Sequence, residues 1–198
     1  MKNLTLLFAL VLLVAQTHAQ ADRFYYPDAF YFVKEVPLES LQGKPFHFAI
    51  SVKENPADSL SRPRIYAIQA RKGKEDFIGK SLTYAKATNG VWKTYSIDGV
   101  VDNEATRIWL YVAVNGNGDF YFDNLHFSVA DATGALKEKE LLNASFEEKK
   151  LLNGYYMSKR SSSDLKISIS TVANDGKQSV EISSTGQKAA GYHPVASN

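Results

Sequence analysis

The chain has 198 residues, of which 23 are lysine or arginine and 21 are aspartate or glutamate, so its formal net charge is +2. So small a charge excludes a general electrostatic attraction to nucleic acid, and the basic residues form no stripe with the aromatic ones. There is no cysteine, which excludes disulfide bonds, and a hydrophobic fraction of 44% is ordinary for a globular protein.

The first 21 residues have the pattern of a secretory signal peptide. Lys2 gives a positive start, residues 4–15 are apolar, and Ala19-Gln20-Ala21 is a small-residue cleavage site. The apolar run is short for a bilayer span and polar residues follow it directly, so we expect no membrane span after cleavage. Export without disulfides is more typical of bacteria, which predicts a secreted, periplasmic or cell-surface protein of a bacterium.

Residues 22–130 are predicted to form a module of β-strands joined by turns, without a helix. Residues 46–52 alternate apolar and polar side chains, which is the period of a half-buried strand. Further strands are predicted over 64–71, 77–84, 91–97, 107–114 and the stretch after the glycine turn at 115–118. A charged hairpin tip at 72–76 and an Asn89-Gly90 turn separate the middle ones. Short strands at regular spacing predict an all-β fold, an antiparallel β-sandwich.

Residues 131–140 change in character. They are polar and end in a run of alternating charges, Lys137-Glu138-Lys139-Glu140, which is typical of a solvated surface, so we expect a linker there. Within 141–198, residues 165–172 alternate as a further strand.

Several short motifs resemble the jelly-roll carbohydrate-binding modules of the galactose-binding-domain-like type. Leu41-Gln42-Gly43-Lys44 leading into a Phe-rich strand, and the strand with Phe122-Asp123-Asn124, are similar to the later two thirds of such a module. The segment 141–148, with its Asn143 and Phe146-Glu147, and the turn and strand at 174–182 are similar to its first third. The resemblance implies a jelly-roll sandwich that binds carbohydrate and does not catalyse.

The two partial matches come in reversed order along the chain, and this leaves three interpretations open. In the first, residues 141–198 supply the strands that 22–130 lacks, as in a circular permutation. In the second, they begin a second, truncated module, and in the third, each part stands alone. Two strands alone are marginally stable in water, which makes the permuted arrangement attractive.

The candidate ligand residues start from the strand at 107–114. Trp109 and Tyr111 share one face of a strand whose other face is also apolar. Aromatic rings on a face that should be solvated indicate either a sugar-stacking platform or a covered surface. If the sheets pair as the resemblance implies, His47 and Arg71 share the face with them, which predicts a glycan-binding set of Trp109, Tyr111, His47 and Arg71.

The resemblance also implies a structural calcium ion held by Asp123 and Glu147. Ca²⁺ prefers six to eight oxygen ligands, and carboxylates with backbone carbonyls supply them. The two residues are far apart in sequence, so this prediction requires the permuted arrangement. The alternative is that both are hydrogen-bonded carboxylates at strand ends.

No sequence motif for catalysis is present, neither a nucleophile elbow, nor a His-Glu-x-x-His helix, nor a P-loop. We therefore predict a secreted, non-catalytic carbohydrate-binding-like module. Two alternatives remain: an accessory region of a larger exported hydrolase whose catalytic domain lies beyond residue 198, and a structural or protein-interaction β-sandwich without a small ligand.

Overall fold

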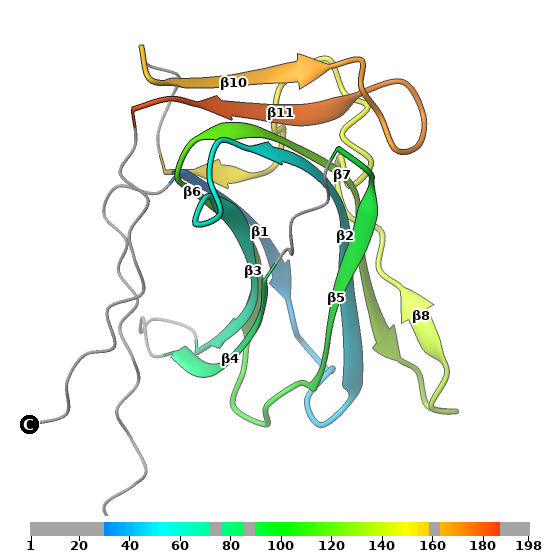
Figure 1. The fold of residues 1–198 in the computed structure, drawn as a ribbon. Coiled ribbons are helices and arrows are strands. Elements are labelled where there is room, and N and C mark those ends of the chain that lie inside the picture. Colours follow the sequence, from blue (N-terminus) through cyan, green and yellow to red (C-terminus); the bar gives the residue numbers. More distant parts are fainter. Residues whose placement is uncertain (1–29, 72–76, 85–89, 159–162, 187–198) are drawn as a thin grey trace, which may run out of the picture.

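The protein is an all-β sandwich of two antiparallel sheets in the computed structural model, which describes residues 30–71, 77–84, 90–158 and 163–186 (Figure 1). Sheet A has five strands in the order β4 (Phe77–Tyr84), β3 (Arg62–Ala70), β6 (Arg107–Asn115), β1 (Phe30–Pro37) and β9 (Tyr156–Met157). Sheet B has the order β10 (Leu165–Ser170), β11 (Ser179–Ser184), β7 (Gly118–Ala130), β2 (Pro45–Pro56) and β5 (Lys93–Val100), and β8 (Leu136–Glu138) pairs with the end of β7. The predicted fold class is confirmed, and the architecture is compatible with a jelly roll.

The two sheets enclose one apolar core. Along each strand alternate side chains point inward, as the period of two requires. Rings from both sheets meet there: Phe32 of β1 lies edge-on to Phe122 of β7, with ring centroids 5.4 Å apart. Both side chains are fully buried. The core is therefore a sandwich interior, and each sheet keeps a second, outer face for other purposes.

The strand predictions agree with the observed strands apart from their ends, but three strands were not predicted. β8 and β9 are too short to leave a pattern in the sequence. β1 lies between β6 and β9 in the sheet, and it carries Lys34 and Glu35 in its middle, which interrupt the apolar run.

Residues after 140 contribute to both sheets. β9 pairs with β1 in sheet A, while β11 pairs with β7 in sheet B and β10 with β11. In Figure 1 the β10–β11 hairpin lies across the top of the sandwich. Between the two, residues 141–155 form turns that bring Phe146 and Leu152 into the core. The stretch expected to be a linker contains β8, and Asp131 closes its turn by accepting the backbone N–H of Thr133 at 2.8 Å.

A β-bulge in β7 lies directly beside Asp123, one of the two predicted calcium ligands. Ala49 of β2 lies opposite His126, but Ser51 lies opposite Asp123, so two β7 residues face the single residue between them. One of the two, Asn124, has φ of 49°, a conformation that asparagine tolerates better than most residues.

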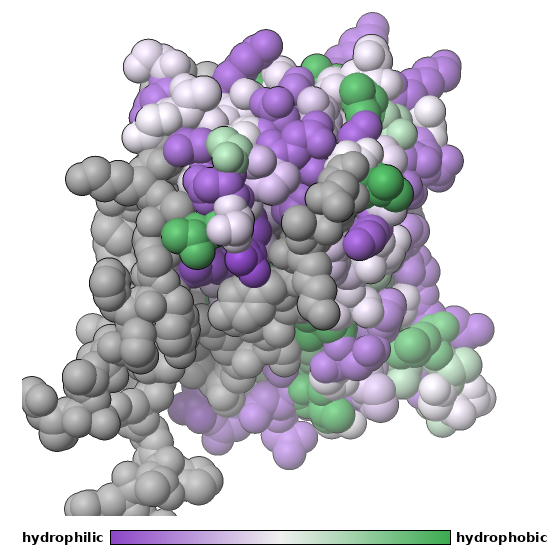
Figure 2. Space-filling model, viewed as in Figure 1, coloured by the Kyte–Doolittle hydropathy of each residue, from purple (hydrophilic) through white to green (hydrophobic). Residues whose placement is uncertain are grey.

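Within the described ranges, no helix is long and apolar enough to cross a membrane. Figure 2 shows a mainly hydrophilic surface over β10 and β11, with hydrophobic residues in separate spots. The predicted signal peptide (1–21), the hairpin tip at 72–76 and Asn89 lie outside the described residues.

Candidate functional site

The outer face of sheet A is the first candidate site, and its composition follows from strand register. Tyr111 of β6 lies opposite Val33 of β1 on one side and Tyr66 of β3 on the other. Side chains directly opposite one another on neighbouring antiparallel strands share a face. This outer face therefore gathers the predicted residues Trp109 and Tyr111 with aromatic neighbours that the sequence analysis did not select.

Four tyrosines form a row across the strands of this face. The ring of Tyr111 stacks on that of Tyr31, with centroids 4.7 Å apart, and meets Tyr66 edge-on at 5.3 Å. Tyr31 in turn lies 6.1 Å from Tyr156 of β9. Tyr66 is buried, Tyr31 and Tyr111 are half-buried, and Tyr156 is 65% exposed. The row is thus open to solvent at its β9 end.

Burial raises the pKa of the Tyr111 phenol, and the neighbouring Tyr31 and Tyr66 add to the effect. An ordinary phenol is already neutral at physiological pH, and this shift keeps the Tyr111 phenol neutral into the alkaline range as well.

Trp109 is fixed by two charged neighbours. Its indole N–H donates to Glu35 Oε2 at 2.7 Å. The guanidinium of Arg107 lies over the indole ring, 5.0 Å from its centroid, and its Nη1 is 3.6 Å from the same Glu35 oxygen. We call Glu35, Arg107 and Trp109 the Trp109 triad. It lies on the outer face of sheet A, next to Tyr111.

The structure does not bring all four predicted ligand residues together. Arg71 follows the last residue of β3, at the end of sheet A where Arg107 lies, and forms an ion pair with Glu104. His47 belongs to sheet B, where its Nδ1 is 2.7 Å from Asp98 Oδ1 on the neighbouring β5. His47 therefore lies on the outer face of the opposite sheet and not beside Trp109.

Asp123 and Glu147, the predicted metal pair, both bind the turn that joins β10 to β11. Asp123 Oδ2 accepts the backbone N–H groups of Asn174 and Asp175 at 2.7 and 3.1 Å. Glu147 Oε1 accepts those of Lys177 and Gln178 at 2.8 and 3.0 Å. The two carboxylates thus come to the same turn from β7 and from the 141–155 segment.

Burial raises the pKa of Asp123, and the carboxylate of Glu147 raises it further, while three backbone amide hydrogen bonds partly offset both effects. The donor set suits a hard cation in chemical type, because it consists of carboxylate oxygens whose mutual repulsion a cation would relieve. Within the described part of the chain, no group of three or more His, Asp or Glu side chains gathers as a metal site, so backbone carbonyls would have to complete the coordination. Calcium stays a prediction.

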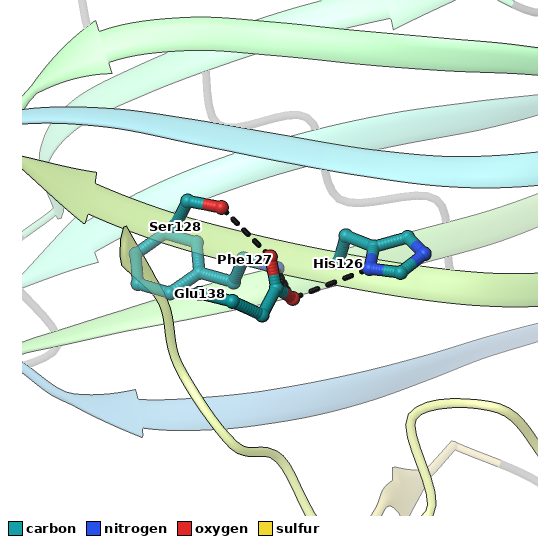
Figure 3. Close-up of polar contacts among 4 residues, drawn as sticks. All are labelled: His126, Phe127, Ser128 and Glu138. Atoms are coloured by element: carbon teal, nitrogen blue, oxygen red, sulfur yellow. Dashed lines mark hydrogen bonds and ion pairs between the residues drawn. The ribbon is translucent and has the colours of Figure 1, made fainter. Parts of the chain in front are cut away.

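A pocket of about 380 Å³ lies beside Glu147, between the outer face of β7 and residues 138–148. On its β7 side, Glu138 Oε2 accepts the hydroxyl of Ser128 at 2.8 Å, and Oε1 is 3.3 Å from His126 Nδ1 and 3.2 Å from the backbone nitrogen of Phe127 (Figure 3). The Glu138 carboxylate is occupied by these contacts and fastens β8 to β7.

Sequence reasoning missed most of the residues around Trp109 and Tyr111. Tyr31 and Glu35 lie on β1, which was not predicted, and Tyr156 lies on a strand of two residues. Alternation within Tyr31, Val33 and Glu35 is the signal that could have placed them on one face.

Comparisons with protein-family models, with curated proteins and with solved structures found no match for this chain.

Proposed function

We propose that the protein is a non-catalytic module that binds glycan on the outer face of sheet A. The observation that carries the proposal is the contrast between the two outer faces. Sheet A presents Trp109 and four tyrosines beside Glu35 and three arginines, Arg62, Arg64 and Arg107, while sheet B presents Tyr121 among polar side chains that include His47, Asp98, His126 and Ser128. In a two-layer sandwich both outer faces should be polar unless one is used.

Aromatic rings held rigidly beside hydrogen-bonding groups suit a sugar. The C–H faces of a pyranose pack on aromatic rings, and its hydroxyls need nearby donors and acceptors. Tyr156 at the open end and the Trp109 triad provide both kinds of contact. From strand spacing, Tyr156 and Trp109 are separated by roughly 12 Å, a distance that an oligosaccharide of a few units can cover.

The test is affinity electrophoresis of the purified protein in gels that contain soluble polysaccharides. We expect retardation by at least one polysaccharide, and loss of that retardation in Trp109→Ala and in Tyr156→Ala. His47→Ala is the matched control, because it removes a ring from the outer face of sheet B. Unchanged migration in every gel would contradict the proposal.

A protein-interaction surface is the second candidate. It is favoured by the contacts that the rings already make, since Tyr111 lies between Tyr31 and Tyr66 and the indole of Trp109 is engaged by Glu35 and Arg107. If a partner protein covers this face, the same two substitutions would abolish its binding while no polysaccharide retards the wild type.

The structural calcium ion implied by the resemblance belongs to this proposal as a stabilising group. Asp123 and Glu147 are its ligands among the side chains, and a cation that binds only the folded state stabilises it by mass action. We expect the melting temperature to rise in 1 to 10 mM calcium relative to EDTA, a range set at roughly 10 to 100 times the dissociation constant of a weak extracellular site. Glu147→Gln should abolish the difference, and equal melting temperatures in calcium and EDTA would contradict the site.

A further inference from the structure

The three side chains of the Trp109 triad hold one another in place. Trp109 Nε1 and Arg107 Nη1 both approach Oε2 of Glu35, at 2.7 and 3.6 Å. The guanidinium also stacks on the indole. Glu35 and Trp109 lie directly opposite one another on β1 and β6, and Arg107 is two residues from Trp109 on the same strand face. Three flexible side chains are thereby ordered before any ligand arrives, which lowers the entropic cost of binding.

The triad keeps hydrogen-bonding capacity on its exposed side. Glu35 Oε1 makes no hydrogen bond to a described residue, and the carboxylate side chain is 54% exposed. The Arg107 side chain is 28% exposed, and the closest carboxylate oxygen among the described residues lies beyond hydrogen-bond distance of its Nη1. An acceptor and a set of donors therefore reach solvent side by side, next to the edge of an indole.

We propose that this triad selects neutral glycans over acidic ones, and that it recognises a pair of adjacent hydroxyl groups. This inference rests on the glycan-binding function proposed above. Each sugar hydroxyl can donate one hydrogen bond and accept another, so one hydroxyl donates to Glu35 Oε1 while its neighbour accepts from Arg107. Within the triad the one positive and the one negative charge balance, and the next arginine on this face, Arg64 of β3, lies opposite Ala113 and is buried.

The balance of charge is what separates the two classes of ligand. When a uronic acid or a sulfated sugar binds to Arg107 through its anionic group, that group also lies next to the exposed Glu35 carboxylate. Like charges in such contact oppose binding, and the guanidinium is already partly neutralised by Glu35. A neutral sugar meets no such repulsion and uses both members of the pair.

The experiment measures binding of two sets of soluble polysaccharides to the full-length protein. Xyloglucan, galactomannan and mixed-linkage β-glucan are the neutral set, and polygalacturonate and alginate are the acidic set. Binding is followed by affinity electrophoresis and by tryptophan fluorescence in a Trp92→Phe background, where Trp109 is the remaining tryptophan. Glu35→Gln and Arg107→Met are the test variants, and His47→Ala is the control.

We expect a neutral polysaccharide to bind, and each test variant to weaken it about tenfold or more, as loss of one hydrogen bond to a charged group does. Glu35→Gln should at the same time strengthen binding of the acidic set, a change that a merely structural role of Glu35 would not produce. Melting curves of both variants identify any loss that comes from unfolding.

Tighter binding of the acidic set by the wild type would overturn the inference and leave the glycan-binding function in place. The inference would also be overturned, with the function again left in place, if both variants fold and bind the neutral polysaccharide with unchanged affinity. Absence of binding to either set would overturn the proposed function itself, and the inference with it.

Discussion

Lys34 is a buried cation that is satisfied by main-chain oxygens. It points inward from β1, is only 5% exposed, and its Nζ donates to the carbonyls of Leu142 and Gly154 at 2.6 and 3.2 Å. The ring of Tyr155 lies 4.5 Å from the same nitrogen. Burial lowers the pKa of Lys34, and the carboxylate of Glu148 partly restores it. One residue of sheet A thus holds the 141–155 segment.

Lys34→Met should lower the free energy of unfolding by roughly 2–3 kcal/mol, because two carbonyl oxygens lose a charged donor. Chemical denaturation followed by circular dichroism measures the change. The matched control is Lys166→Met, an exposed lysine on β10, for which we expect a change within about 0.5 kcal/mol. Equal stability of the two variants would mean that water replaces the lysine at no cost.

Tyr121 gives a testable dependence on pH. Its burial, together with a hydrogen bond to Glu181, raises the pKa of the phenol from 10.0 to about 12. The unfolded chain therefore loses this proton before the folded one does, so the stability that Tyr121 contributes is complete below pH 10 and is lost as the pH rises to about 12.

Tyr121→Phe should make this alkaline loss of stability less steep. Urea unfolding of both proteins from pH 9 to pH 12 tests it, the range being set by a free tyrosine at about 10. The two proteins should differ by a constant amount at the low end and converge or cross at the high end. Parallel curves across the whole range would show that Tyr121 ionises normally in the folded state.

At the scale of single elements, the turn between β10 and β11 is held in place by side chains from other parts of the chain. Four of its backbone N–H groups are bound by two carboxylates of distant segments, Asp123 and Glu147. The hydroxyl of Ser51 adds a contact of 3.3 Å to the side chain of Asn174. A turn anchored in this way fixes the position of the whole hairpin at the β7 side of sheet B, where β11 pairs with β7.

Gly176→Ala tests this anchoring. Gly176 has φ of 66°, and a Cβ added there would overlap Glu147 Oε1. We expect the free energy of unfolding to fall by about 2–3 kcal/mol, from the strained backbone and the displaced carboxylate together. Hydrogen exchange should also quicken in β10 and β11 before it does in β2.

Gly134→Ala is the control for backbone strain alone, since Gly134 has φ of 85° and a Cβ there would meet nothing within 4 Å. It should cost only about 1 kcal/mol. In a Glu147→Ala background the cost of Gly176→Ala should drop towards that value, because the clashing oxygen is gone. Equal costs in both backgrounds would mean that the glycine matters for its conformation only.

The sequence predicted the strands in which apolar and polar side chains alternate over many residues. It did not predict the short or interrupted strands, nor the long-range contacts of the turns between strands. β2, β6 and β7 each carry long period-two patterns and were found. β1 was missed because Lys34, an inward residue, has a charge, and no local pattern reveals that carbonyls more than 100 residues away satisfy it. For the same reason the amides that bind Asp123 and Glu147 were not predictable, although the resemblance did pair the two carboxylates.

At the scale of the whole molecule, residues after 140 complete both sheets and part of the core. The buried apolar side chains that they supply are Phe146, Leu152, Leu165, Ile167, Val180 and Ile182. Full burial of such a side chain is worth about 2 kcal/mol. Six of them contribute on the order of 10 kcal/mol, which equals the whole net stability of a typical domain.

A chain that ends at residue 140 should therefore not fold as a cooperative unit. Its β7 would lose the partner strand β11, Lys34 would lose its acceptors, and the core would open on the side of Phe32 and Phe122. We expect broad urea unfolding and poorly dispersed amide resonances for this fragment. Because the missing strands add to existing sheets, a separately produced fragment of residues 141–198 should restore a sharp transition when the two are mixed. A cooperative transition of the first fragment alone would mean that residues 30–140 fold as a domain by themselves. The later strands would then not be required for folding.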